Sequence, residues 1–221
     1  MEKRGIYILR VTRKKNAALG IGSLIVFIAL VLVAGIAAYV LLSTSSQLQI
    51  KSNLAGEQTT HEAATGLKIT SIVGHNTSGL IDKILIDVTP RPGSQNINMN
   101  TCRIELSNSS VKYVLKYSGS HWVNRKTGSA NLFGEPAFSS VASEFGLIVM
   151  NDIDDSCLAT DPIINSGDSV CLAINTTACF HRITRNINVL GDVIPENGAW
   201  GIIHFRTPSS FTSAIIILQE D

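Results

Sequence analysis

Residues Leu19 to Leu42 read LGIGSLIVFIALVLVAGIAAYVLL, and this stretch decides how the chain is built. Its apolar residues follow neither the spacing of an amphipathic helix nor the alternation of a half-buried strand. A helix that is apolar on every face must lie in lipid or among other apolar helices, because no face remains for water. At about 1.5 Å per residue the stretch extends roughly 36 Å, which is enough to cross a bilayer.

The charges around this stretch divide the chain into two unlike parts. Residues 1–17 hold six basic side chains and one acid, a net charge of 6 − 1 = +5, whereas the whole chain carries +1. The remaining residues therefore sum to 1 − 5 = −4, which argues against a nucleic-acid partner for the body of the protein. A basic leader before an apolar run indicates membrane insertion with the leader held in the cytoplasm.

The apolar run differs from an ordinary secretory signal in its length and in the residues after it. It is longer than a typical signal core, and no A-x-A cleavage site comes soon after it. Residues 43–66 are helix-tolerant with sparse apolar positions, and Gly66 is a suitable helix stop. We therefore predict one helix over residues 18–66 after a leader at 1–17.

Beyond Gly66 the sequence becomes typical of β-structure, with short β-branched runs separated by turn residues such as Pro90–Gly93 and Pro195–Gly198. The runs lie at 67–73, 80–88, 102–106, 111–117, 145–150, 169–174, 185–194, 200–205 and 213–218. Many short strands with few helical windows predict an antiparallel, immunoglobulin-like sandwich or barrel over residues 67–221. The expected fold class is thus α+β, with a long apolar helix followed by an all-β domain.

The junction of the leader and the apolar run resembles the class III signal of archaeal flagellins (archaellins). It reads Arg13-Lys14-Lys15-Asn16-Ala17 and then ALGIGSLIVFIA from Ala18. The segments 151–155, 167–170, 193–199 and 207–211 also look like archaellin segments. The resemblance implies a structural subunit of an extracellular motility filament, formed by one or several archaellins, with a membrane-inserted precursor.

The resemblance also implies particular sites and partners. A prepilin-type signal peptidase would cut the bond between Ala17 and Ala18, and the retained helix would lie first in lipid and later in a filament core. The archaellum assembly and motor machinery would be further partners. Small residues would let neighbouring helices approach closely; they are Gly20, Gly22, Ala29, Ala34, Gly35, Ala37 and Ala38.

Two other functions remain open at this point. An archaeal adhesive pilin would share the helix and its processing, and a membrane-anchored extracellular binding domain or hydrolase would share the apolar run. Bacterial-type pilins carry glutamate at the fifth mature position, where this chain has Gly22 as archaellins do. No G-x-S-x-G, phosphate loop or paired-carboxylate motif indicates an enzyme or a cofactor.

The β-region carries three further features. The sequons at Asn76, Asn108 and Asn175 are candidate N-glycosylation sites on an exported surface. The four cysteines are compatible with one or two disulfides or with small buried thiols. The aspartates between residues 152 and 168 could hold a hard cation, but we expect a solvated acidic loop without a metal.

Overall fold

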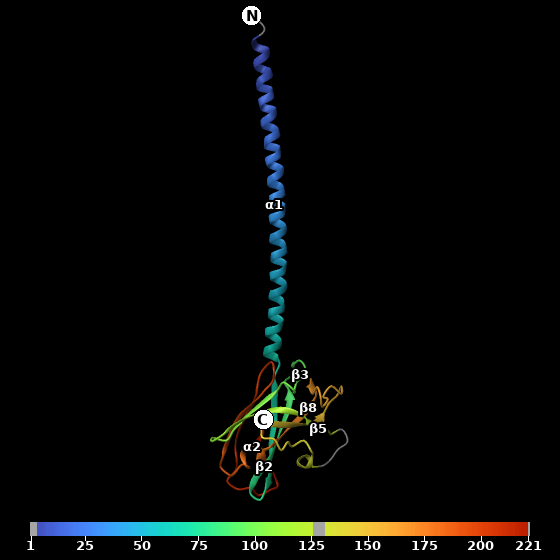
Figure 1. Cartoon of the computed structure of the whole chain (residues 1–221), viewed down its shortest axis with the longest axis vertical. Helices are drawn as coiled ribbons and strands as arrows, with labels where there is room; N and C mark the ends of the chain where they lie inside the picture. The colour runs from blue at the N-terminus through green and yellow to red at the C-terminus, as the bar shows by residue number, and fades with distance from the viewer. Residues whose placement is uncertain (1–3, 126–130, 221) are drawn as a thin grey trace. The chain divides into compact units, whose positions relative to one another are not determined.

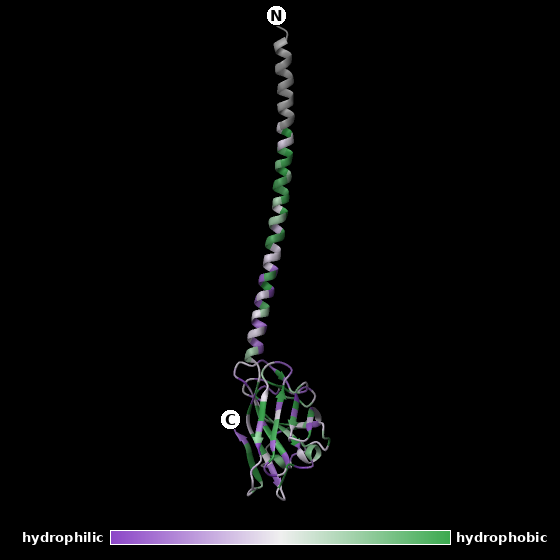
Figure 2. Cartoon of the chain, turned by 90° about the vertical axis from the view of Figure 1, so that its left-hand side faces the viewer, coloured by the Kyte–Doolittle hydropathy of each residue, from purple (hydrophilic) through white to green (hydrophobic). Residues whose placement is uncertain are grey.

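The computed structural model describes residues 4–125 and 131–220, and it describes side chains from Gly20 onward. Helix α1 (Arg4–Ala64) precedes the β-domain, and the chain divides into two compact units, residues 1–57 and 58–221. The helix contains no proline, and its apolar part is rich in leucine, alanine and isoleucine, which favour a helix or tolerate it. Figure 2 shows this apolar part giving way to a mixed polar surface in the later turns.

The β-domain is built on one large sheet (Figure 1). Its elements are β1 (Leu67–Thr77), β2 (Leu80–Pro90), β3 (Ile97–Asn98), β4 (Arg103–Ser107), β5 (Lys112–Asn124), η1 (Leu132–Gly134), β6 (Glu144–Asn151), β7 (Ile163–Ile164), β8 (Ser169–Asn175), α2 (Thr176–Phe180), β9 (Asn188–Ile194), β10 (Gly201–Arg206) and β11 (Ile215–Glu220). The sheet order is β10-β9-β4-β5-β6-β8-β2-β1-β11, and β3 pairs with β7 in a separate two-stranded sheet. All pairs are antiparallel except the parallel pair of β5 and β6.

The sheet curls until its two end strands meet. The side-chain amide of Gln219 on β11 accepts a hydrogen bond from the His204 backbone N–H (2.8 Å) and donates one to the Ile202 carbonyl (3.1 Å) on β10. One amide side chain thus bonds to β10 as the peptide group of a neighbouring strand would. The inward faces of the strands form one continuous core, in which Phe145, Leu115 and Ile104 are fully buried.

A second, smaller core lies on the outer face of β2, β6 and β8. Leu85, Ile148 and Ala173 on these strands pack with Phe133 and Ala137 of the connection between β5 and β6. These strands are therefore buried on both faces, which explains why residues 145–149 form an unbroken buried run instead of alternating. The prediction of a long helix followed by an all-β sandwich or barrel is confirmed.

The four cysteines are small buried thiols in this structure and form no disulfide. Cys102, Cys157, Cys171 and Cys179 are all free and buried, and burial raises the pKa of each thiol to between about 11 and about 12.

The prediction that the aspartates between residues 152 and 168 form a solvated loop is wrong for Asp152 and Asp168, which are only 4% and 2% exposed. Both carboxylates accept backbone N–H groups of their own loop, which offsets the loss of water.

Candidate assembly site

The surface of α1 between Gly20 and Leu42 is the longest continuous stretch of exposed, mainly apolar side chains among the described residues. Every side chain in this range is exposed, and the exposed fractions of its large apolar side chains run from 50% to 73%. Water-soluble monomers rarely leave such a surface open. Among the described residues, α1 is the one helix that is long and apolar enough to cross a membrane.

Two hydroxyl side chains in and beside this surface are satisfied within the helix. The Ser23 hydroxyl donates to the Gly20 carbonyl (2.9 Å), and the Thr44 hydroxyl donates to the Leu41 carbonyl (3.0 Å). Neither hydroxyl therefore needs water, and the segment can be transferred into lipid or a packed helix bundle at little cost. Tyr39, near the end of the run, is 73% exposed and is of the residue type enriched at membrane–water interfaces.

The predicted helix-packing residues have no packing role inside the subunit. A Cβ built on Gly20, Gly22 or Gly35 would meet nothing within 4 Å. Ala29, Ala34 and Ala38 are likewise exposed, and Ala34 and Ala38 are four residues apart on one helix face. Small residues at this spacing let a second helix approach closely, and their role in packing between subunits remains a prediction.

The predicted cleavage residues, Ala17 and Ala18, lie in the part of α1 whose side chains are outside the described residues. The helix is continuous from Arg4 across this bond. Cleavage there therefore remains a prediction.

The sequence did not predict how the last turn of α1 is tied to the β-domain. Thr65 and Gly66 lie between the loop that contains Ala199 and the loop that contains Arg91 and Ser94, an arrangement that we call the junction clamp. The Ala199 N–H donates to the Thr65 carbonyl (2.9 Å), and the Arg91 N–H donates to the Gly66 carbonyl (2.9 Å). The Ser94 hydroxyl lies 3.1 Å from both the amide nitrogen and the carbonyl oxygen of Gly66.

Two glycines make the junction clamp possible. A Cβ on Gly66 would approach that of Ala199 to 2.9 Å. Gly198 has a φ of +92°, and a Cβ there would collide with the Thr65 carbonyl oxygen. The turn Pro195–Gly198, which the sequence marked only as a strand boundary, thus also positions the helix end.

The three sequons differ in how their amide groups are used. The Asn76 Nδ2 donates to the Ser213 carbonyl (3.1 Å), and its Oδ1 accepts the Gly79 N–H. Asn108 lies in the turn between β4 and β5, and Asn175 caps α2; the hydrogen bonds described for both use only Oδ1. The side-chain nitrogen, to which a glycan would be attached, is thus hydrogen-bonded at Asn76 and takes no part in the bonds described at the other two.

Comparison with known proteins identifies the family. A family model described as archaeal-type flagellin matches residues 17–205. The chain is 39% identical over 211 residues to Flagellin B2 of Methanocaldococcus jannaschii, covering 93% of this chain and 95% of that protein.

Solved structures agree in fold. The crystal structure of archaeal flagellin FlaB1 from M. jannaschii covers 71% of this chain and 98% of that chain, with 30% identity and a TM-score of 0.63. The structure of the archaeal flagellum of Methanospirillum hungatei strain JF1 covers 90% and 99%, with 16% identity and a TM-score of 0.60, and shows the same fold. The chain therefore belongs to the archaeal-type flagellin family and is a structural subunit of the extracellular archaeal flagellum.

Proposed function

We propose that the subunit assembles through α1, with helices of many copies packed together at the filament centre and the β-domains outside. The observation that carries this proposal is the exposed, charge-free surface from Gly20 to Leu42, in which the Ser23 hydroxyl is already bonded to the helix backbone. Burial of one large apolar side chain is worth roughly 1.5–3 kcal/mol relative to water. Exposed ion pairs between β-domains would contribute at most about 1 kcal/mol each.

Before assembly the same surface would lie in the membrane, so lipid is the first partner in this proposal. Lipid satisfies an apolar surface as well as other helices do, so transfer to the filament must be driven by close helix packing and contacts between outer domains. Ala34, Gly35 and Ala38 are suited to such packing because they are small and exposed. Archaellum assembly and motor proteins would act on this membrane-held subunit.

The precursor is proposed to be cut between Ala17 and Ala18 by a prepilin-type signal peptidase. The basic residues ahead of the bond would stay in the cytoplasm, and the helix would remain in the product. N-terminal sequencing of purified filaments should read Ala-Leu-Gly-Ile-Gly. A mature chain starting beyond Leu42 would contradict the proposal, because it would lack the assembly helix.

We also propose N-glycosylation of the β-domain, with Asn108 and Asn175 modified more fully than Asn76. The reason is that a glycan on Asn76 would replace one of the two hydrogens on a nitrogen that already bonds to Ser213. Intact-mass and glycopeptide analysis of filaments should show a mass above that of residues 18–221, with Asn108→Gln and Asn175→Gln each lowering it. A mass equal to the bare polypeptide, or modification of Asn76 alone, would count against this proposal.

The other functions considered have less support. An adhesive pilin or a membrane-anchored binding domain would not explain a match to the flagellin family over most of the chain. We propose that the subunit works by assembly and catalyses no reaction. Identifying the chain in purified flagellar filaments, and reading its N-terminal sequence there, distinguishes these functions. A membrane-anchored domain would be absent from the filaments.

A further inference from the structure

The hairpin formed by β9 and β10 carries opposite charges at its two ends. Its turn, Pro195–Gly198, lies at the end of the barrel beside the junction clamp and presents the exposed side chain of Glu196. At its open end, where β9 begins and β10 ends, Arg185 and Arg206 are both exposed. We call these two side chains the distal arginines.

The two ends are too far apart to neutralise each other within one subunit. Arg206 pairs with Asn188 at one end of the strand ladder, and Glu196 lies beyond the other end. At about 3.3 Å per residue, the chain from Asn188 to Glu196 extends roughly 25 Å. An ion pair brings its nitrogen and oxygen within about 4 Å of each other. Glu196 therefore cannot pair with the distal arginines of its own subunit.

The distal arginines have no carboxylate partner among the side chains that the structure describes. The Arg185 guanidinium extends over the turn between β1 and β2, where it lies 3.0 Å from a Cβ built on Gly79. Asp82, on the strand after that turn, is already bonded to His75 (2.7 Å). The positive charge at this end of the barrel is thus free to attract an anion.

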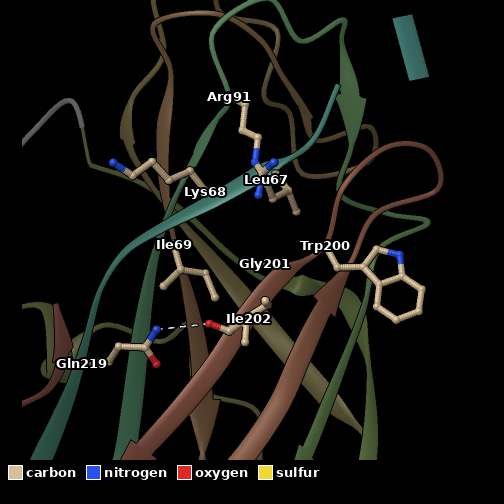
Figure 3. A pocket seen from close by; sticks show the side chains of 8 residues that line it. All are labelled: Leu67, Lys68, Ile69, Arg91, Trp200, Gly201, Ile202 and Gln219. Atoms are coloured by element: carbon tan, nitrogen blue, oxygen red, sulfur yellow. Dashed lines mark hydrogen bonds between the residues drawn. The ribbon is translucent and has the colours of Figure 1, made fainter. Parts of the chain in front are cut away.

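Glu196 is likewise unpaired. Arg91, on the other loop of the junction clamp, extends toward Leu67 (Figure 3). Among the described side chains, none forms an ion pair or a hydrogen bond with the Glu196 carboxylate. The hairpin therefore has a free anion at its turn and free cations at its open end.

The loop before β9 is held in a fixed conformation. Ile183 exchanges two backbone hydrogen bonds with Ile81 (both 2.9 Å), and the Asn186 N–H donates to the Thr207 carbonyl (3.2 Å). The last bond keeps the backbone segments of the two distal arginines adjacent. Three non-glycine residues of this loop have a positive φ, a strained conformation that is typical of functional sites; they are His181, Arg182 and Asn186.

The turn that carries Glu196 is fixed as well. The Ala199 N–H, just after the turn, donates to the Thr65 carbonyl in the junction clamp (2.9 Å). The following strand, β10, is held by the Gln219 side chain, whose Nε2 donates to the Ile202 carbonyl (Figure 3). Two preorganised surfaces lose little conformational entropy when they bind each other.

We propose that Glu196 of one subunit binds the distal arginines of the next copy along the filament. A carboxylate and a guanidinium form charge-assisted hydrogen bonds, and two neighbouring arginines offer several donors. The occupant is a second copy because this chain supplies the matching charge at the opposite end of the same hairpin. The two ends are different, so the contact is head-to-tail and repeats without closing, as a helical filament requires. This inference rests on the proposed assembly through α1.

The contact is weak by itself and depends on the helices. An exposed ion pair contributes little in water, and salt screens it. Subunits joined through α1 hold the two ends of the hairpin at high effective concentration, so the pair forms along the whole filament. Its effect on filament stability should be largest at low ionic strength and should disappear at about 1 M salt, where the Debye length is about 3 Å.

Cysteine pairs test the contact in assembled filaments. The four native cysteines are buried, so oxidation of filaments that carry Glu196→Cys and Arg185→Cys should link only the new pair. The two positions are too far apart to link within a subunit, so we expect a ladder of covalent oligomers on a non-reducing gel, while each single variant stays monomeric. The matched control, Glu196→Cys with Lys116→Cys in the middle of β5, should give no ladder.

The possible results separate this inference from the assembly proposal. Filaments of the cysteine-pair variant without a ladder, or dimers formed by either single variant, would overturn the contact while leaving assembly through α1 intact. Absence of the wild-type chain from filaments would instead overturn the assembly proposal.

Charge exchange measures the same contact without cysteines, and it decides the matter if the cysteine pair does not assemble. Arg185→Glu and Glu196→Arg should each lower the temperature at which filaments dissociate at low salt, and the double variant should recover most of the loss. Glu220→Arg reverses an exposed charge on β11 outside the contact and should leave this temperature unchanged.

The detergent-solubilised monomers of these variants should unfold at the wild-type temperature, because the contact lies between subunits. Equal dissociation temperatures for all the filaments, additive losses in the double variant, or losses that persist at about 1 M salt would rule out the contact.

Discussion

Gly35→Asp should abolish filament assembly while leaving the β-domain folded and the precursor processed. Gly35 is exposed in the middle of the apolar surface, and nothing lies within 4 Å of a Cβ built there, so the subunit itself loses no packing. In a bundle of helices the carboxylate would be buried without a partner, at a cost of several kcal/mol for each subunit. Insertion in the membrane should survive, because one aspartate costs about 2.5–3.5 kcal/mol there and the many surrounding apolar residues outweigh it.

Two control variants define the cause of this loss. Gly35→Ala adds a methyl group without charge and should assemble with at most a modest loss of filament stability. Gly56→Asp places the same charge in the later part of α1, where Lys51 and Glu57 already introduce charges, and it should also assemble. Electron microscopy of surface filaments and the chain's distribution between membrane and filament fractions measure the outcome. Filaments of normal length from the Gly35→Asp chain would refute a core of packed helices.

Gly198→Ala should destabilise the unit formed by residues 58–221 by about 2–4 kcal/mol. About 1–2 kcal/mol of this loss arises because Gly198 has a φ of +92°, a backbone conformation that residues with a Cβ adopt only with strain. The rest arises because the new Cβ would push away the Thr65 carbonyl, weakening its hydrogen bond with the Ala199 N–H.

Gly93→Ala is the matched control for this prediction. Gly93 also has a positive φ, +86°, but the nearest atom to its built Cβ is the Ala64 Cβ at 3.9 Å. It should therefore show the backbone strain without the collision, a loss of about 1–2 kcal/mol. Urea unfolding of the fragment 58–221 measures both variants. Equal losses for the two would mean that the contact between Gly198 and Thr65 contributes nothing to stability.

The sequence predicted the elements whose residues carry a strong local pattern. Every one of the nine β-branched runs became a strand of the large sheet, since β-branched residues bounded by turns have few alternatives. The two-residue strands β3 and β7 and the short helix α2 were missed because they are too short to show any periodicity.

Features set by contacts distant in sequence could not be predicted. The burial of Asp152 and Asp168 depends on backbone N–H groups that only the folded loop brings to them. The junction clamp depends on Gly198 meeting Thr65, and nothing in the local sequence of either residue indicates the other. The exposed surface of α1 was predictable because a stretch without polar residues is apolar on every face whatever surrounds it.

The closure of the sheet by β11 sets the order in which the subunit can mature. β1 is the first strand of the domain to be synthesised, and it remains an open edge until β11, near the far end of the sequence, pairs with it. Pairing across such a sequence distance is slow, because the intervening chain must be ordered first. The free edge of β1 is therefore covered only after β11 has been synthesised, and a chain shortened before Ile215 would leave this edge open to pairing with another chain.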